Sequence, residues 1–145
     1  MAEMPDELKC LDIMSTPPVT ASPNETAQQA ARKMVEKRIG SLIVVDENGS
    51  LLGIVTKTDL VREVVAPGRD PGKVMLQDVM TKNPYYVTTE SPVREAADIM
   101  GSYGVGHLPV IDPESQKVVG VISMRDIVRL APHYIELALL SRGQS

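Results

Sequence analysis

The chain has 145 residues, 43% hydrophobic and 23% charged, which indicates a globular protein of one ordinary domain or two very small ones. A formal net charge of -4 disfavours broad, salt-driven nucleic-acid binding, because such binding needs a clustered positive surface. The single cysteine, Cys10, excludes an intrachain disulfide and a structural zinc site built from several cysteines.

The N-terminal residues 1–9 are polar and acidic, with none of the apolar stretch that is typical of a signal peptide. No apolar run approaches the ~20 residues that a membrane span needs. We therefore expect a cytoplasmic protein with no membrane partner.

The first extended stretch is expected at residues 19–21, and a helix follows it. The helix carries an amphipathic stripe, and Thr26 with Gln29 fits a capping box at its start. Two strands come next, at 42–45 and 51–56, joined by a hairpin-type turn at 46–49, and a second helix starts near Thr58. The stripe consists of Ala27, Ala30, Ala31, Met34 and Val35.

The same elements then recur, shifted by 66 positions, as from Met14 to Met80. The shift grows by one residue in the turn at 113–117, where an insertion is tolerated. The second copy is expected to have strands at 85–88, 108–111 and 118–123 and a second helix near Arg125. Its first helix has the stripe Val93, Ala96, Ala97 and Met100, with Ser91 as N-cap and Pro92 at the first helical position.

Each copy therefore reads as a β-α-β-β-α unit of an α/β (α+β) fold, and two copies packed sheet to sheet would bury one aliphatic core. The predicted division is a tail at 1–10, a first domain at 11–66, a linker at 67–75, a second domain at 76–131 and a tail at 132–145. The linker is rich in Pro and Gly, and the last tail holds an apolar run at 134–140 that could cap the core or meet a partner.

Three motifs occur in both copies in the same order. They are an Asp-hydrophobic-Met opening at 12–14 and 78–80, the proline that follows it, and a Gly-hydrophobic-hydrophobic-Ser/Thr-x-x-Asp segment at 53–59 and 120–126. Over residues 11–130 the chain resembles a tandem pair of CBS (cystathionine β-synthase) domains, a Bateman module. The resemblance implies two pseudo-twofold-related clefts for AMP, ADP, ATP or S-adenosylmethionine, no required cofactor, homodimerisation and a regulated protein partner.

Asp59 and Asp126 suit the two hydroxyls of a ribose, because a carboxylate accepts a hydrogen bond from each. Thr56 and Ser123, three residues earlier, lie where a helix start can cradle a phosphate. Arg125 adds a cation and Thr58 a hydroxyl. The alternative for both pairs is a capping box that needs no ligand.

In the family, each cleft joins the aspartate segment of one copy to the first strand and the post-helix segment of the other. Backbone groups of the first strand would read the adenine edge, and His107 is the candidate phosphate contact, with a backbone-bonded histidine as the alternative. Carried over, one cleft takes Thr56, Thr58, Asp59, Tyr86, Val87, Gly106 and His107, and the other takes Ser123, Met124, Arg125, Asp126, Thr20, Ala21, Gly40 and Ser41.

A nucleotide sensor is the favoured function, and a ligand-free dimerisation module is the alternative. An enzyme is disfavoured, because the sequence shows no catalytic-cysteine loop, no Ser/His/Asp set and no metal-binding cluster. No catalytic or metal-ligating residue is predicted, and nucleic-acid binding is disfavoured by the net charge.

Overall fold

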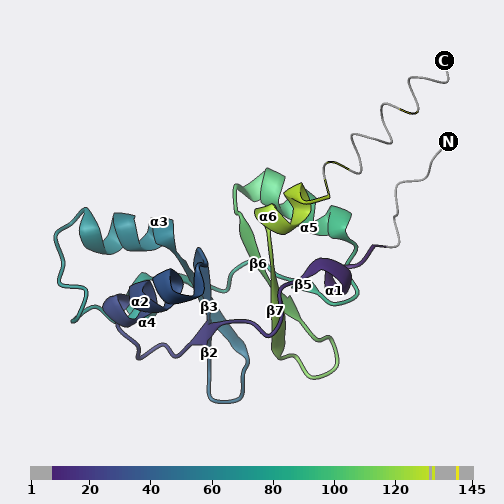
Figure 1. The fold of residues 1–145 in the computed structure, drawn as a ribbon. Helices are drawn as coiled ribbons and strands as arrows, with labels where there is room; N and C mark the ends of the chain where they lie inside the picture. Colours follow the sequence, from purple (N-terminus) through teal and green to yellow (C-terminus); the bar gives the residue numbers. More distant parts are fainter. Residues whose placement is uncertain (1–7, 131, 133–139, 141–145) are drawn as a thin grey trace. The chain divides into compact units, whose positions relative to one another are not determined.

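A computed structural model describes residues 8–130, together with Pro132 and Leu140. The apolar tail segment predicted at 134–140 lies, apart from Leu140, outside the described residues. The chain divides into two compact units, each with its own sheet and helices (Figure 1). Among the described residues, the first-repeat unit spans 17–84 with 115–118, and the second-repeat unit takes 8–16, 85–114 and 119–130.

The first-repeat unit is a mixed four-stranded sheet in the order β1-β2-β3-β4. The short edge strand β1 runs parallel to β2, while β3 is antiparallel to both β2 and β4. The helix that follows β3 continues as one π-helical segment, η1. Its elements are β1 Thr20–Ala21, α2 Ala27–Lys37, β2 Ser41–Val45, β3 Leu51–Thr56, α3 Lys57–Leu60, η1 Val61–Val65, α4 Leu76–Val79 and β4 Thr81–Lys82.

The second-repeat unit has a three-stranded sheet in the order β5-β6-β7, with β5 parallel to β6. Both sheets therefore have a short parallel strand at one edge, where the repeat predicts a short extended stretch. Its elements are α1 Cys10–Ile13, β5 Val87–Thr88, α5 Val93–Tyr103, β6 His107–Ile111, β7 Val118–Ser123 and α6 Met124–Val128. None of the helices in the described part of the chain is long and apolar enough to cross a bilayer.

The opening segments of the two repeats are exchanged between the units. Helix α1 opens the first repeat in sequence but packs in the second-repeat unit, and α4 opens the second repeat but packs in the first-repeat unit. Backbone bonds fix both: Val93 N donates to Leu8 O at 2.9 Å, and Ala27 N donates to Val74 O at 2.8 Å. Each exchanged segment thus satisfies the first N–H of a long helix, a group that has no partner inside the helix itself.

Each unit has an aliphatic core, as the absence of Trp and Phe predicts. In both units the long helix lays its small and unbranched residues over the sheet, so that Ala30 and Ala96 are fully buried. The fully buried side chains of the two cores include Leu42, Val44, Val55 and Leu76 in the first-repeat unit and Leu108, Val110, Ile122 and Cys10 in the second.

Two local predictions are wrong. Ser91 is not the N-cap of α5: Pro92 takes that position, the helix begins at Val93, and the Ser91 hydroxyl accepts from Thr88 N at 3.0 Å. Leu8 already accepts the Val93 N–H, so a hydroxyl cap is not needed. Val35 does not belong to the buried stripe of α2, because its side chain is 78% exposed.

The remaining element predictions hold to within one or two residues. The capping box of Thr26 with Gln29 is formed at the start of α2, and the turn after β2 is closed by Gly49 N donating to Asp46 O at 3.0 Å. Strands β3 and β7 have the predicted bounds, and β2 and β6 each begin one residue earlier than predicted.

Candidate functional site

The motif aspartate of the first repeat lies in the first turn of α3, directly after β3. Thr56 is the N-cap of α3, and its hydroxyl accepts from Asp59 N at 3.1 Å. Asp59 Oδ2 in return accepts from Thr56 N at 2.8 Å. The predicted capping box is therefore formed, and it holds the carboxylate in a fixed orientation with only 5% of the residue exposed.

The second repeat builds the same arrangement in the first turn of α6, directly after β7. Ser123 Oγ accepts from Asp126 N at 3.2 Å, and Asp126 Oδ2 accepts from Ser123 N at 2.8 Å and from Ser123 Oγ at 3.0 Å. Asp126 is 7% exposed. We call residues 56–59 and 123–126 the two aspartate turns, and their matching hydrogen bonds confirm the repeat at atomic detail.

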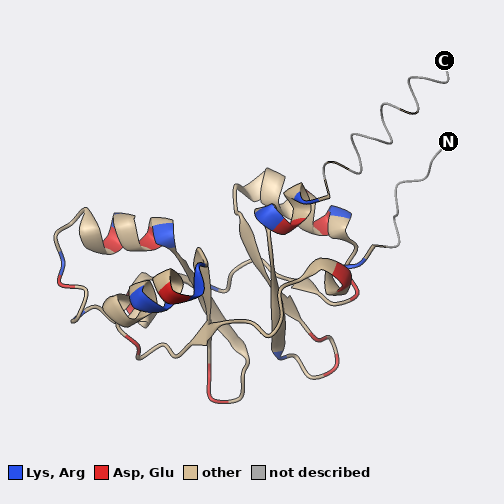
Figure 2. Ribbon diagram, in the orientation of Figure 1, with Lys and Arg blue, Asp and Glu red and all other residues tan. Residues whose placement is uncertain are grey.

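Each aspartate turn has an arginine three residues after its aspartate. Arg62 Nη2 donates to Asp59 Oδ1 at 2.7 Å, and Arg129 Nη1 lies 3.7 Å from Asp126 Oδ1. The arginine side chains are 60% and 69% exposed, whereas the carboxylates are buried. Basic and acidic positions lie close together along the continuous helix α3–η1 and on α6 (Figure 2). The Oδ1 atom of each aspartate is thus the carboxylate oxygen that faces an exposed cation.

Some backbone N–H groups of the aspartate turns already have hydrogen-bond acceptors. Lys57 N donates to Gly40 O at 3.1 Å, and Met124 N donates to Gly106 O at 2.8 Å. Because a helix start offers only a few free N–H groups, a phosphate at these turns would have to rely on groups other than these two. The side chains of Thr58, Met124 and Arg125 are exposed.

The predicted post-helix residues lie beside the aspartate turn of their own repeat. Ser41 is paired with Thr56 in the β2–β3 ladder and is 7% exposed. His107 opens β6, directly after Gly106, and is half-buried. The structure therefore places Gly40 and Ser41 beside the aspartate turn at 56–59, and Gly106 and His107 beside the one at 123–126. The clefts expected from the family, which pair segments of opposite repeats, stay a prediction.

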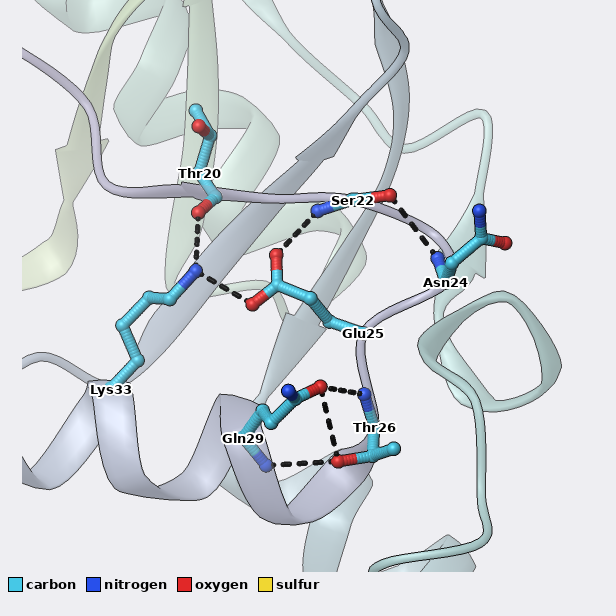
Figure 3. Close-up of polar contacts among 7 residues, drawn as sticks. All are labelled: Thr20, Ser22, Asn24, Glu25, Thr26, Gln29 and Lys33. Carbon is cyan, nitrogen blue, oxygen red and sulfur yellow. Dashed lines mark hydrogen bonds and ion pairs between the residues drawn. The ribbon is translucent and has the colours of Figure 1, made fainter.

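The two predicted adenine-reading strands are not equivalent. In the first repeat, Lys33 of α2 reaches back to β1, and its Nζ donates to Thr20 O at 2.9 Å and to Glu25 Oε1 at 2.8 Å (Figure 3). Ala21 beside it is buried. In the second repeat, Val87 is likewise buried on β5 and Tyr86 is 50% exposed, but the residue equivalent to Lys33 is Ile99.

Lys33 is a residue that the sequence interpretation missed. The signal was present, because Lys33 interrupts the match between the two helices at a position where the second copy carries an aliphatic residue. Among the described residues, no group of three or more His, Cys, Asp or Glu is placed to hold a metal ion.

Comparison with known proteins identifies the class. The model of the CBS domain family matches residues 10–66 and 76–133. The chain belongs to the CBS domain family, with two such domains in tandem, as the motifs predict. Its fold is similar to the crystal structure of the CBS domain pair of protein MJ0100 in complex with 5′-methylthioadenosine and S-adenosyl-L-methionine. The TM-score is 0.78 at 32% identity, covering 87% of this chain and 97% of that one.

Two curated relatives show how far the likeness extends. An uncharacterized protein of Methanopyrus kandleri is 37% identical over 81% of this chain and 59% of its own length. An L-aspartate semialdehyde sulfurtransferase of Methanocaldococcus jannaschii is 34% identical over 82% of this chain but only 22% of its own length. The chain thus spans between about a fifth and three fifths of these relatives, so their full activities do not transfer to it.

Proposed function

We propose that the chain is a regulatory sensor that binds an adenosine-containing ligand at its aspartate turns. The observation that carries this proposal is the duplicated geometry of Asp59 and Asp126. In each, the capping box occupies Oδ2 and leaves Oδ1 turned toward an exposed arginine. A carboxylate oxygen has two lone pairs, so Oδ1 can accept from a ribose hydroxyl while the cap stays intact.

The arginines can bind the negatively charged groups of the ligand. Arg62 donates to Asp59 Oδ1 and to Glu63 Oε1, and Arg129 lies beside Asp126 Oδ1. Both guanidinium groups are exposed and can turn toward a phosphate or a carboxylate of the ligand. AMP, ADP, ATP and S-adenosylmethionine all combine a ribose diol with such a group or with a sulfonium. The solved CBS pair that binds two adenosine derivatives supports this class of ligand for the present chain.

A second candidate is a ligand-free interaction module. It is favoured by the completeness of both capping boxes, which account for the buried aspartates without any ligand. It is also favoured by the exposed apolar residues of the helices that follow the turns, where Val61, Val65 and Val128 are 58%, 70% and 58% exposed. Such faces suit self-association, and a homodimer belongs to both candidates.

A thermal-shift panel separates the two candidates. The sensor raises its melting temperature with S-adenosylmethionine, AMP or ATP, by an amount that grows with the ratio of free ligand to Kd. Asp59→Asn with Asp126→Asn removes the charge but keeps an oxygen that can accept in the cap, so it abolishes the shift without unfolding the protein. Gln29→Ala, which breaks the capping box of α2 and touches neither aspartate turn, keeps the shift. No shift with any of these ligands would support the interaction module.

A further inference from the structure

Two half-exposed tyrosine rings stack on each other at the surface of the second-repeat unit. Tyr85 lies just before β5, and Tyr103 is the last residue of α5. Their ring centroids are 4.1 Å apart, and the ring planes are inclined by 15°. The two residues are 48% and 56% exposed, so the pair does not belong to the core. Two separate elements of this unit therefore present their phenol groups in direct contact.

The core fixes the backbone on both sides of the pair. Pro84 is buried just before Tyr85, and Val87, in β5, is 2% exposed. On the helix, Met100 is 3% exposed, and its carbonyl accepts from Gly104 N at 3.0 Å. The two rings consequently stay neighbours, while their exposed parts are accessible to reagents in solvent.

The first repeat has no such pair. Val19 occupies the position of Tyr85, and Lys37 occupies that of Tyr103, so neither position carries a phenol. Tyr86, next to Tyr85, is 50% exposed but lies outside the stacked pair. It therefore provides a matched reference, with equal exposure and without the ring contact.

We propose that Tyr85 and Tyr103 form a site of oxidative cross-linking, where a haem peroxidase with hydrogen peroxide joins the two rings as dityrosine. Each phenol gives up one electron and its hydroxyl proton, and the two radicals couple at the ring carbons next to the oxygens. The ring hydrogen of each coupled carbon then moves to the oxygen, which restores both phenols. Hydrogen peroxide takes up the two electrons and the two protons and becomes two water molecules.

The ring contact favours this bond over a cross-link between chains. A fixed neighbour acts at a high effective concentration, which dilution of the protein does not lower. The new bond would also close a loop over residues 85–103, which removes conformational freedom from the unfolded chain. The cross-linked chain should accordingly melt at a higher temperature than the untreated one. The pair shares no residue with either aspartate turn, so its cross-linking does not depend on ligand binding.

The test treats the dilute full chain with a haem peroxidase and hydrogen peroxide. Intact mass, dityrosine fluorescence and mapping of tryptic peptides are then measured. The wild type should yield a monomer that has lost two hydrogen atoms, in which the tryptic peptides 83–94 and 95–117 are joined. Oxidation of exposed methionines adds oxygen instead, so the mass distinguishes the two reactions.

Four phenylalanine variants locate the cross-link. Tyr85→Phe and Tyr103→Phe keep a ring in the stack and remove one hydroxyl, so each should fold as the wild type and abolish the joined peptides. Tyr86→Phe and Tyr134→Phe should retain them. Joined peptides that persist in Tyr85→Phe would overturn the site, as would a wild type that forms none or that forms cross-links only between chains. An equal yield from the urea-denatured chain would overturn the role of the fixed contact.

Discussion

Met80 covers Gly53 so closely that a Cβ on the glycine would stand 2.6 Å from Met80 Sδ and 2.7 Å from Thr81 O. Met14 has the same relationship to Gly120, with 2.5 Å to Sδ and 3.0 Å to Ser15 O. In both units, the methionine of the opening motif thus packs directly against the glycine of the aspartate segment. Each contact joins the opening of one repeat to the body of the other.

Gly53→Ala should therefore destabilise the protein. The new methyl group would meet the backbone carbonyl of Thr81, which cannot move without breaking the β3–β4 pairing, so we expect a loss of about 1–3 kcal/mol in the free energy of unfolding. Chemical denaturation measures it. The matched control is Gly101→Ala in α5, where a Cβ meets nothing within 4 Å; it should be neutral or stabilising by up to about 1 kcal/mol. Equal effects of the two substitutions would refute the close-contact explanation.

The ends of the two long helices make a second comparison. Both C-caps are left-handed, with φ 56° at Arg38 and φ 66° at Gly104. A residue with a Cβ pays about 1 kcal/mol for that conformation, which glycine avoids. Arg38→Gly is expected to raise the free energy of unfolding by a few tenths to about 1 kcal/mol, and Gly104→Ala to lower it by about 1 kcal/mol. A change of stability in the same direction for both substitutions would contradict a conformational cost at these two caps.

Cys10 should give stability a pH dependence on the alkaline side. Burial raises the pKa of this thiol from 9.0 to about 11, and the side chain is fully buried. Between those values the unfolded chain loses the proton that the folded chain keeps, so stability falls as pH rises from about 9 to about 11, by up to ~1.4 kcal/mol per pH unit. Below pH 9 the thiol contributes no slope.

Denaturation at several pH values tests this, with Cys10→Ala as the control. The alanine variant is less stable below pH 9 because it leaves a small cavity, but its slope between pH 9 and 11 should be shallower than that of the wild type. A thiol reagent should label native Cys10 slowly and the denatured chain fast. Rapid labelling of the native protein would show that the thiol is accessible.

The sequence predicted most elements because their signals are local. The amphipathic stripe, the Thr26 capping box and the Asp-Glu-Asn-Gly turn each lie within a few residues, and all three are present, apart from Val35 in the stripe. The exchange of opening segments could not be predicted, because Val93 finds its acceptor on Leu8, far away in the chain. The Ser91 error has the same origin: a distant carbonyl replaced the local cap.

Of the candidate site, too, one part could be predicted from local sequence and another part could not. The geometry of Asp59 and Asp126 follows from a local motif, so its capping role could be named in advance. The engagement of Thr20 O by Lys33 depends on how α2 packs over β1, which spacing along the chain does not encode. A polar residue that replaces an aliphatic one between two otherwise matching repeats is the sequence signal for such a contact.

Two substitutions should separate the contribution of the helix cap to stability from the contribution of Arg62 to ligand binding. Thr56→Ala removes the hydroxyl that accepts from Asp59 N and should cost about 1 kcal/mol of stability. Arg62→Met breaks the ion pairs to Asp59 and Glu63, whose shared cation is 60% exposed, and should cost less than about 1 kcal/mol. If the chain is a nucleotide sensor, Arg62→Met nevertheless lowers the affinity for AMP more than the affinity for 5′-methylthioadenosine, which has no phosphate. Equal weakening of the two ligands would remove Arg62 from the phosphate contact.

The most direct test of the central claim compares AMP with 2′,3′-dideoxy-AMP on the wild-type chain by calorimetry. If Asp59 or Asp126 accepts from the ribose diol, the dideoxy nucleotide should bind at least about tenfold more weakly, which corresponds to roughly 1.4 kcal/mol for the lost charge-assisted hydrogen bonds. Equal affinity of the two nucleotides would show that the buried carboxylates serve the helix caps alone.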